Sequence, residues 1–158
     1  MSPVCTAIQN GGQMNIVKAL LDRGADANAV LADGRTPLML SIDSPDIVKA
    51  LIDKGADVNA KNKDTGDSIL MTMVLADNTE SVKLLLDKGA NVNAKGDRGR
   101  NALMFAASNN QIGIAKLLLQ KAADVKVKAD NGETAYVMAK RNKFSKMMQL
   151  LKQAGAKE

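Results

Sequence analysis

The chain has 158 residues, a net charge of +5 and a globular balance of 46% apolar and 25% charged residues, which suits one domain with a buried core. It contains no histidine and one cysteine, Cys5, so histidine-dependent catalytic triads, histidine zinc sites and an intramolecular disulfide are excluded. No apolar run approaches the roughly 18 residues that a membrane helix needs, and the first residues lack a signal-peptide pattern. The sequence leaves the compartment unknown: cytoplasm is the default, and export applies if a signal peptide was removed upstream.

Five apolar segments with helical spacing recur along the chain. They cover residues 16–21, 47–52, 82–86, 114–119 and 147–151. A phrase of the type Gly-Ala-Asp-Val-Asn-Ala, complete or degraded, follows each segment, and its copies begin 31 to 34 residues apart, at Gly24, Gly55, Gly89, Ala122 and Gly155. The pattern predicts a helix over each segment, ended by a residue in the left-handed conformation that glycine adopts at low cost.

A second phrase precedes each of these helices and predicts another, shorter one. Its leading residue is always Ser, Thr or Asn, at Ser2, Thr36, Ser68, Asn101 and Thr134. Such side chains accept hydrogen bonds from the free N–H groups of a first helical turn. Tight-turn sequences stand before the later copies, at 33–34, 98–99 and 130–132. Each unit therefore contains a cap, a short helix, a turn, a second helix and an extended link.

The repeated units predict a stacked architecture, because one such unit cannot bury its apolar face alone. The units cover about residues 1–29, 30–60, 61–94, 95–127 and 128–158. This pattern resembles the ankyrin repeat, whose signatures are Gly-x-Thr-Pro-Leu-His and Gly-Ala-Asp-Val-Asn-Ala. The resemblance implies an all-α ankyrin-repeat solenoid of about five helix-turn-helix units with β-hairpin-like connecting loops, as a single domain over 1–158.

The chain departs from the family pattern in every unit. Apolar residues replace the motif histidine and are expected in the interior: Cys5, Met39, Met71, Met104 and Val137. Unit 2 is two residues short, which we assign to its inter-helix turn at 43–45, and unit 3 has one extra residue near 63–65. Ala122 replaces the helix-stop glycine, which costs about 1 kcal/mol if the left-handed conformation is kept.

The first unit shows no clearly polar outer face. Val4 and Ile8 lie on its first helix, whereas terminal repeats normally shield the core with polar residues. Either the first helix is a minimal cap or the sequence was trimmed from a longer chain.

Residues that could carry catalysis or bind a metal have a structural interpretation in every case. Cys5 occupies an internal helix position, so we interpret it as a core residue. Asp22, Asp53 and Asp87 recur at one repeat position and are interpreted as surface residues. No glycine-rich phosphate loop ending in Gly-Lys occurs, and no calcium-loop spacing. We predict a non-enzymatic protein without catalytic residues, cofactor or metal.

The net charge is confined to the last unit. Residues 1–120 carry equal numbers of acidic and basic side chains, so residues 121–158 carry the whole +5. Four basic residues cluster at its inter-helix turn: Lys140, Arg141, Lys143 and Lys146. They form either a solubilising cap or a docking patch, and both interpretations stay open. Of the aromatic residues only Phe144 lies within this cluster, which argues against nucleic acid as a partner.

The resemblance to ankyrin repeats implies that a partner protein binds the concave face of loop tips and first helices. Candidate contact residues vary between units while the frame is kept: Asp33, Arg35, Asp64, Asp67, Asp97, Arg98, Arg100, Asp130, Asn131, Glu133, Ser108 and Asn109. We predict a monomeric protein–protein interaction scaffold whose partner the sequence does not identify. Two alternatives stay open: a stand-alone structural or stress-protective protein without a dedicated partner, and a binder of an anionic partner through the basic last unit.

Overall fold

The computed structural model describes residues 2–157, which form ten α-helices, one 3₁₀ turn and a single antiparallel bridge between Lys61 and Ser68. The helices come in pairs. The first helices are α1 Pro3–Gln9, α3 Pro37–Leu40, α5 Ile69–Leu75, α7 Ala102–Ser108 and α9 Ala135–Arg141. The second helices are α2 Met14–Asp22, α4 Pro45–Asp53, α6 Thr79–Asp87, α8 Ile112–Gln120 and α10 Ser145–Gln153. The 3₁₀ turn η1 spans Asp97–Gly99.

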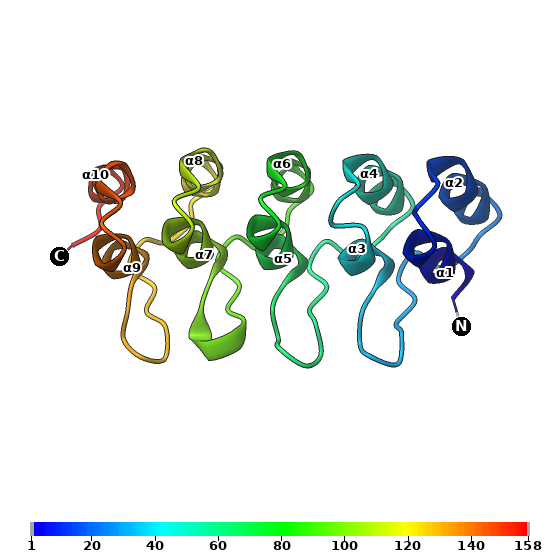
Figure 1. Cartoon of the computed structure of the whole chain (residues 1–158), viewed down its shortest axis with the longest axis horizontal. Coiled ribbons are helices and arrows are strands. Elements are labelled where there is room, and N and C mark those ends of the chain that lie inside the picture. The colour runs from blue at the N-terminus through cyan, green and yellow to red at the C-terminus, as the bar shows by residue number, and fades with distance from the viewer. Residues whose placement is uncertain (1, 158) are drawn as a thin grey trace.

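The five helix pairs stand side by side in chain order (Figure 1). The first helices form one layer and the second helices another, while the longer loops project from the first layer, away from the second (Figure 1). The two chain termini lie at opposite ends of the row. The predicted all-α solenoid of helix pairs with hairpin-like loops is confirmed.

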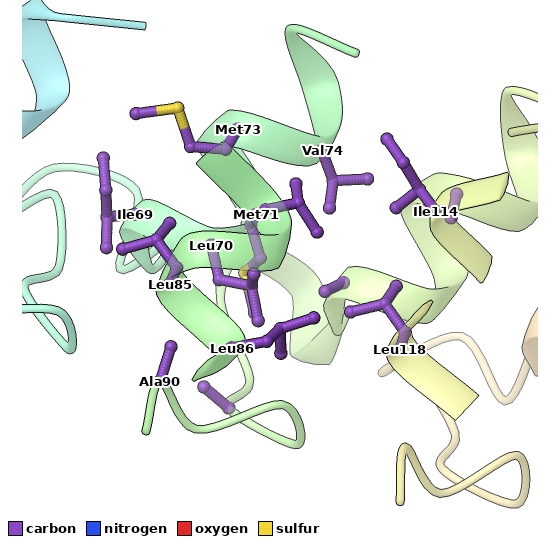
Figure 2. Close-up of a cluster of buried hydrophobic side chains, with 14 of the residues drawn as sticks. Ile69, Leu70, Met71, Met73, Val74, Leu85, Leu86, Ala90, Ile114 and Leu118 are labelled. Carbon is purple, nitrogen blue, oxygen red and sulfur yellow. The ribbon is translucent and has the colours of Figure 1, made fainter. Parts of the chain in front are cut away.

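The core lies between successive pairs. Leu86, the eighth residue of α6, belongs to the same buried cluster as Ile114 and Leu118, the third and seventh residues of α8 (Figure 2). All three side chains are at most 6% exposed. Burying a side chain of this size stabilises a fold by about 2 kcal/mol, so each pair depends on the apolar faces of its neighbours.

The predicted side-chain caps form in only part of the stack. Ser68, Asn101 and Thr134 each accept a hydrogen bond from the amide three residues later. Ser2 and Thr36 make no such bond, so for them the prediction is wrong. In both cases proline occupies the start of the helix and fixes the backbone there without a side-chain cap.

The shortening of the second unit lies in a helix and not in the predicted turn. Helix α3 has four residues, whereas each of the other first helices has seven. Buried Ser41 ends it, because both its amide and its hydroxyl donate to the carbonyl of Leu38, at 3.3 and 3.0 Å. The extra residue of the third unit lies in the loop between α4 and α5, as predicted.

Four of the five residues at the motif-histidine position are buried as expected. Cys5, Met39, Met71 and Met104 are at most 7% exposed. Val137 is 36% exposed, so the prediction of an interior position is wrong there. The reason is its place on α9 in the last pair, where no following pair within the described residues covers this side of the helix.

Two ladders of polar contacts connect the pairs. Aspartates at the ends of the second helices pair with lysines of the next pair, and the three distances are 2.8 Å for Asp22–Lys54, 3.8 Å for Asp53–Lys88 and 2.8 Å for Asp87–Lys121. In the following loops an asparagine oxygen accepts from the next pair's main chain, at 2.7 Å for Asn28–Asp57, 2.8 Å for Asn59–Asn91 and 2.8 Å for Asn93–Asp124. The predicted structural role of the repeated aspartates is confirmed, and the ladders fix the spacing of the loops.

Candidate protein-interaction surface

The cysteine, which is the residue with nucleophilic chemistry, lies in the core of the stack. Cys5 is fully buried, and this burial raises the pKa of its thiol, which makes the nucleophilic thiolate scarce near neutral pH. The interpretation of Cys5 as a core residue is confirmed. Among residues 2–157 no three Cys, Asp or Glu side chains lie close enough together to hold a metal ion.

The loop before α3 presents a self-contained ion pair. The Arg35 guanidinium contacts the Asp33 carboxylate at 2.7 Å, and the Arg35 amide donates to the other oxygen of that carboxylate at 3.1 Å. The hydrogen bond from the Arg35 side chain is the main cause that lowers the pKa of Asp33. Both side chains are roughly half exposed, so a partner can contact them from outside without breaking the hairpin.

In the loop before α5 the two candidate aspartates have different roles. Asp67 accepts a hydrogen bond from the Asp97 amide at 2.9 Å, and an added Cβ on Gly96 would lie 2.0 Å from the same carboxylate. Asp67 therefore joins two neighbouring loops. Asp64 is exposed, and only its amide is used, donating to Asn62 at 2.8 Å. Its carboxylate has no ion pair among residues 2–157.

The loop before α7 carries two arginines with different surroundings. Arg98 is well exposed, has φ 54° and lies 3.5 Å from Asp97. Arg100 is half-buried, and its Nε is buried without a hydrogen-bond partner within the described residues. Both arginines line a hollow of about 210 Å³ together with Asp130 and Asn131 of the next loop. Arg98 is the more exposed guanidinium of the two, and a guanidinium pairs readily with a carboxylate.

The loop before α9 is joined to its own helix by Glu133. Asn131 donates to this carboxylate at 2.8 Å, and Arg141, at the end of α9, forms an ion pair with it. The pKa of Glu133 is lowered, first by the Asn131 hydrogen bond, with contributions from Arg141 and Arg100. Loop tip and first helix therefore contribute to one continuous polar surface in this pair.

The exposed ends of the first helices form a row along the stack. Leu75, Ser108 and Arg141 are the last residues of α5, α7 and α9. The ends of α7 and α9 are joined directly, because the Asn142 side chain donates to the Ser108 carbonyl at 3.1 Å. Leu75 is 50% exposed. Asn109 is exposed directly after Ser108.

Sequence reasoning missed Phe105 as a surface residue. It lies one helical turn before Asn109 and is half-buried on the edge of the core. The signal that could have found it is the repeat register, because Thr72 stands at the same position of α5 and is also half-buried. A half-exposed aromatic side chain provides a large contact area at low entropic cost.

The four predicted basic-patch residues are all exposed around the turn between α9 and α10. Arg141 is partly neutralised by its ion pair with Glu133. Lys140, Lys143 and Lys146 make no ion pair within residues 2–157. The structure places the patch at the end of the stack, next to the last loop tip.

Comparison with known protein families accounts for most of the chain. A family model described as ankyrin repeats (3 copies) matches residues 1–62 and again residues 44–129. No curated protein matches the sequence. No helix within residues 2–157 has the length and apolar character needed to cross a membrane. Because the matched residues, the helix pairs and the repeated phrases coincide, the chain belongs to the ankyrin repeat family.

Proposed function

We propose that this protein is a scaffold that binds a partner protein through its concave face of loop tips and first helices. Ankyrin repeats generally mediate protein–protein interaction, which supports the class of function. The observation that carries the proposal is the hollow of about 210 Å³ between two loop tips, which Arg98 and Arg100 line together with Asp130 and Asn131. Arg98 presents an exposed guanidinium at this hollow, and a carboxylate of a bound protein would pair with it there.

The first helices and the loop tips together have the composition of an interface. Leu75 and Phe105 provide apolar area in the first-helix layer, and Arg98 provides an exposed guanidinium beside the hollow. Interfaces commonly combine aromatic and arginine anchors with a polar rim. The charged tips of the other loops would form that rim.

The test is a capture experiment, which is repeated with variants of the loop tips and with variants of the second-helix layer. The chain is immobilised, incubated with extract of its native cell at high salt, and the retained protein is identified and titrated. The combined variant Arg35→Ala, Arg98→Ala and Arg100→Ala should weaken binding at least roughly tenfold, the loss expected when one or two hot-spot residues are removed. Lys83→Ala and Lys116→Ala, exposed on the second-helix layer, are the matched controls and should change nothing.

Two results would contradict this function. Retention that is unaffected by the arginine variant but lost in the lysine controls would place binding on the second-helix layer. A chain that retains no protein under any condition would favour the stand-alone structural or stress-protective alternative.

A second candidate function has its own supporting observation: three lysines of the last pair are exposed and make no ion pair within residues 2–157. Lys140, Lys143 and Lys146 could attract an anionic partner, and such binding would weaken strongly with salt. Retention that disappears at high salt and on changing Lys140, Arg141, Lys143 and Lys146 to Gln would support this candidate.

A further inference from the structure

The outer side of α1 and α2, which we call the N-terminal end face, has the apolar residues of an internal surface. The third and seventh residues of α8, Ile114 and Leu118, belong to the same buried cluster as Leu86 of the preceding pair (Figure 2). In the later pairs Ile47, Ile114 and Met147 at the third position are at most 2% exposed. The same positions of α2 are Ile16 and Leu20, and Ile16 is 46% exposed.

This face differs from the one expected from sequence. Val4 and Ile8 are buried towards the rest of the stack, at 0% and 8% exposure, so they are not the residues that leave it apolar. A groove of about 410 Å³ crosses the face instead, lined by Pro3, Thr6, Ala7, Asn10, Gln13, Ile16 and Leu20. The groove lies between the two helices where a preceding pair would pack.

The C-terminal end of the stack has a charged residue where the other second helices have an apolar one. The eighth residue of a second helix faces the following pair and is Leu21, Ile52, Leu86 or Leu119 in the first four pairs. In α10 the residue is Lys152, whose ammonium lies 5.5 Å from the Tyr136 ring centre. A charged residue at this position makes the C-terminal end unsuited to further stacking, whereas the N-terminal end face has no such substitution.

Polar groups on the N-terminal end face repeat those used between pairs. Arg23 follows α2 at the position where Lys54, Lys88 and Lys121 follow their helices, and each of these lysines pairs with the aspartate that ends the preceding second helix. Within residues 2–157 Arg23 has no ion pair. Arg23 thus has the position of the pairing lysines, but no residue of the described chain provides the carboxylate with which it would pair.

Two further groups follow the same logic. Gln13 is the N-cap residue directly before α2, as Gln111 is directly before α8. The Gln111 side chain donates to the Val74 carbonyl of the preceding pair at 2.8 Å. The Asp26 amide stands where the Asp57 amide donates to Asn28 of the preceding pair. Both Gln13 and Asp26 are exposed. The Arg23 guanidinium, the Gln13 side chain and the Asp26 amide therefore stand at positions that bind a preceding helix pair elsewhere in the stack.

We infer that the N-terminal end face is a docking site for a helix pair of a partner protein whose second helix ends on aspartate and is followed, six residues later, by asparagine. That spacing occurs at three of the four junctions between pairs: Asp22 and Asn28, Asp53 and Asn59, Asp87 and Asn93. At the fourth junction α8 ends on Gln120, and Lys126 stands six residues later. The aspartate pairs with Arg23, the asparagine accepts from the Asp26 amide, and apolar residues of the partner cover Ile16 and Leu20. This surface is separate from the concave face of the proposed function.

A second copy of the chain does not supply this chemistry at its C-terminal end. Helix α10 ends on Lys152 and Gln153, so it has neither the apolar eighth residue nor the terminal aspartate. Head-to-tail association would place Lys152 against Ile16 and leave Arg23 without a carboxylate. The occupant is therefore a helix pair with a different end.

The test uses a tethered probe with the required end. A copy of residues 61–100, which contains Asp87 and Asn93, is joined directly before Ser2, so that Ser2 takes the place of Asn101. A tether gives the probe a high effective concentration at the face. The melting temperature should rise by about 5 °C or more, because added stacking stabilises a repeat array.

Matched variants separate specific docking from a general effect of extra chain. Ile16→Lys should leave the melting temperature of the parent unchanged, since the side chain is exposed there, but should remove most of the gain in the fusion. Asp87→Lys in the added copy should lower the gain in melting temperature, because two cations then face each other. Combining this change with Arg23→Glu should restore the gain, whereas Arg23→Glu alone should not increase it.

Three outcomes would overturn the inference. The first is a fusion with the melting temperature of the parent. The second is a gain that is insensitive to Ile16→Lys and to the charge exchange. The third is a parent chain that dimerises by light scattering and becomes monomeric on Ile16→Lys, because the face would then pair with itself.

Discussion

Ala122 ends α8 in a backbone conformation that alanine adopts only at a cost. Its φ is 62°, and Gly24, Gly55 and Gly89 stand at the same repeat position with φ between 83° and 87°. In this region the Cβ of any residue other than glycine is crowded by its own backbone. The cost predicted at Ala122 depends on this conformation being kept, and the structure shows that it is kept.

We expect Ala122→Gly to stabilise the protein by about 1 kcal/mol, because the strain at the end of α8 is removed. For a chain of this size that corresponds to a rise of roughly 2–4 °C in melting temperature, measured by circular dichroism. The control is Ala123→Gly, which deletes a buried methyl group and should lower the melting temperature. An unchanged or lower value for Ala122→Gly would show that the surroundings favour alanine there.

At the scale of elements, the ion-pair ladder makes stability depend on pH. The pKa values of Asp22 and Asp87 are lowered below their ordinary 3.8, in each case first by the hydrogen bond from the lysine of the next pair, Lys54 or Lys121. A carboxyl whose pKa is lower in the folded state stabilises the fold above its unfolded pKa, and this stabilisation is lost as pH falls through the folded value.

We therefore expect the melting temperature to fall as pH drops below about 4, and part of that fall to come from the ladder. The double variant Asp22→Asn and Asp87→Asn should be slightly less stable than the parent at pH 7 and should lose less on acidification. Thermal melts at pH 7 and pH 3 measure the difference. The effect is small because both pairs are about half exposed. Equal losses in parent and variant would exclude the ladder as a source of acid sensitivity.

The repeat pattern predicted the helices better than it predicted their lengths and caps. The five pairs follow from a period near 33 residues, because each unit repeats the same apolar spacing. The early end of α3 depends on Ser41, which is buried and bonds to the Leu38 carbonyl. The exposure of Val137 depends on the missing cover beyond α9. Both features depend on tertiary contacts, which the sequence of a single unit does not specify.

The candidate surface was predictable as a set of positions but not as a set of contacts. Alignment of the units located the loop tips, yet Asp33 and Asp67 have opposite roles: one pairs within its own hairpin and the other accepts the Asp97 amide of the next loop. Likewise, the pairing of Glu133 with Arg141 joins residues of a loop and a helix. Such contacts depend on how neighbouring loops stack, which spacing alone does not specify.

At the scale of the whole molecule, the stack has a weak joint. Stability in a repeat array is approximately the sum of terms for each unit and each interface, so the array can open in parts. Helix α3 is about one turn long, and it therefore offers α5 a shorter surface than α5 offers α7. The joint between the second and third pairs is the place where the first four helices can separate from the rest.

Hydrogen exchange of the native protein tests this joint. We expect the amides of α5 to α8 to exchange most slowly and those of α1 to α4 to exchange faster, as one group. Leu51→Ala, in the buried face of α4, costs about 2 kcal/mol or more. It should accelerate exchange in the first four helices by at least about 30-fold and leave α7 and α8 nearly unchanged. The same acceleration in α7 and α8 would mean that the five pairs open as one cooperative unit, because the cost of Leu51→Ala would then have crossed the joint at α3.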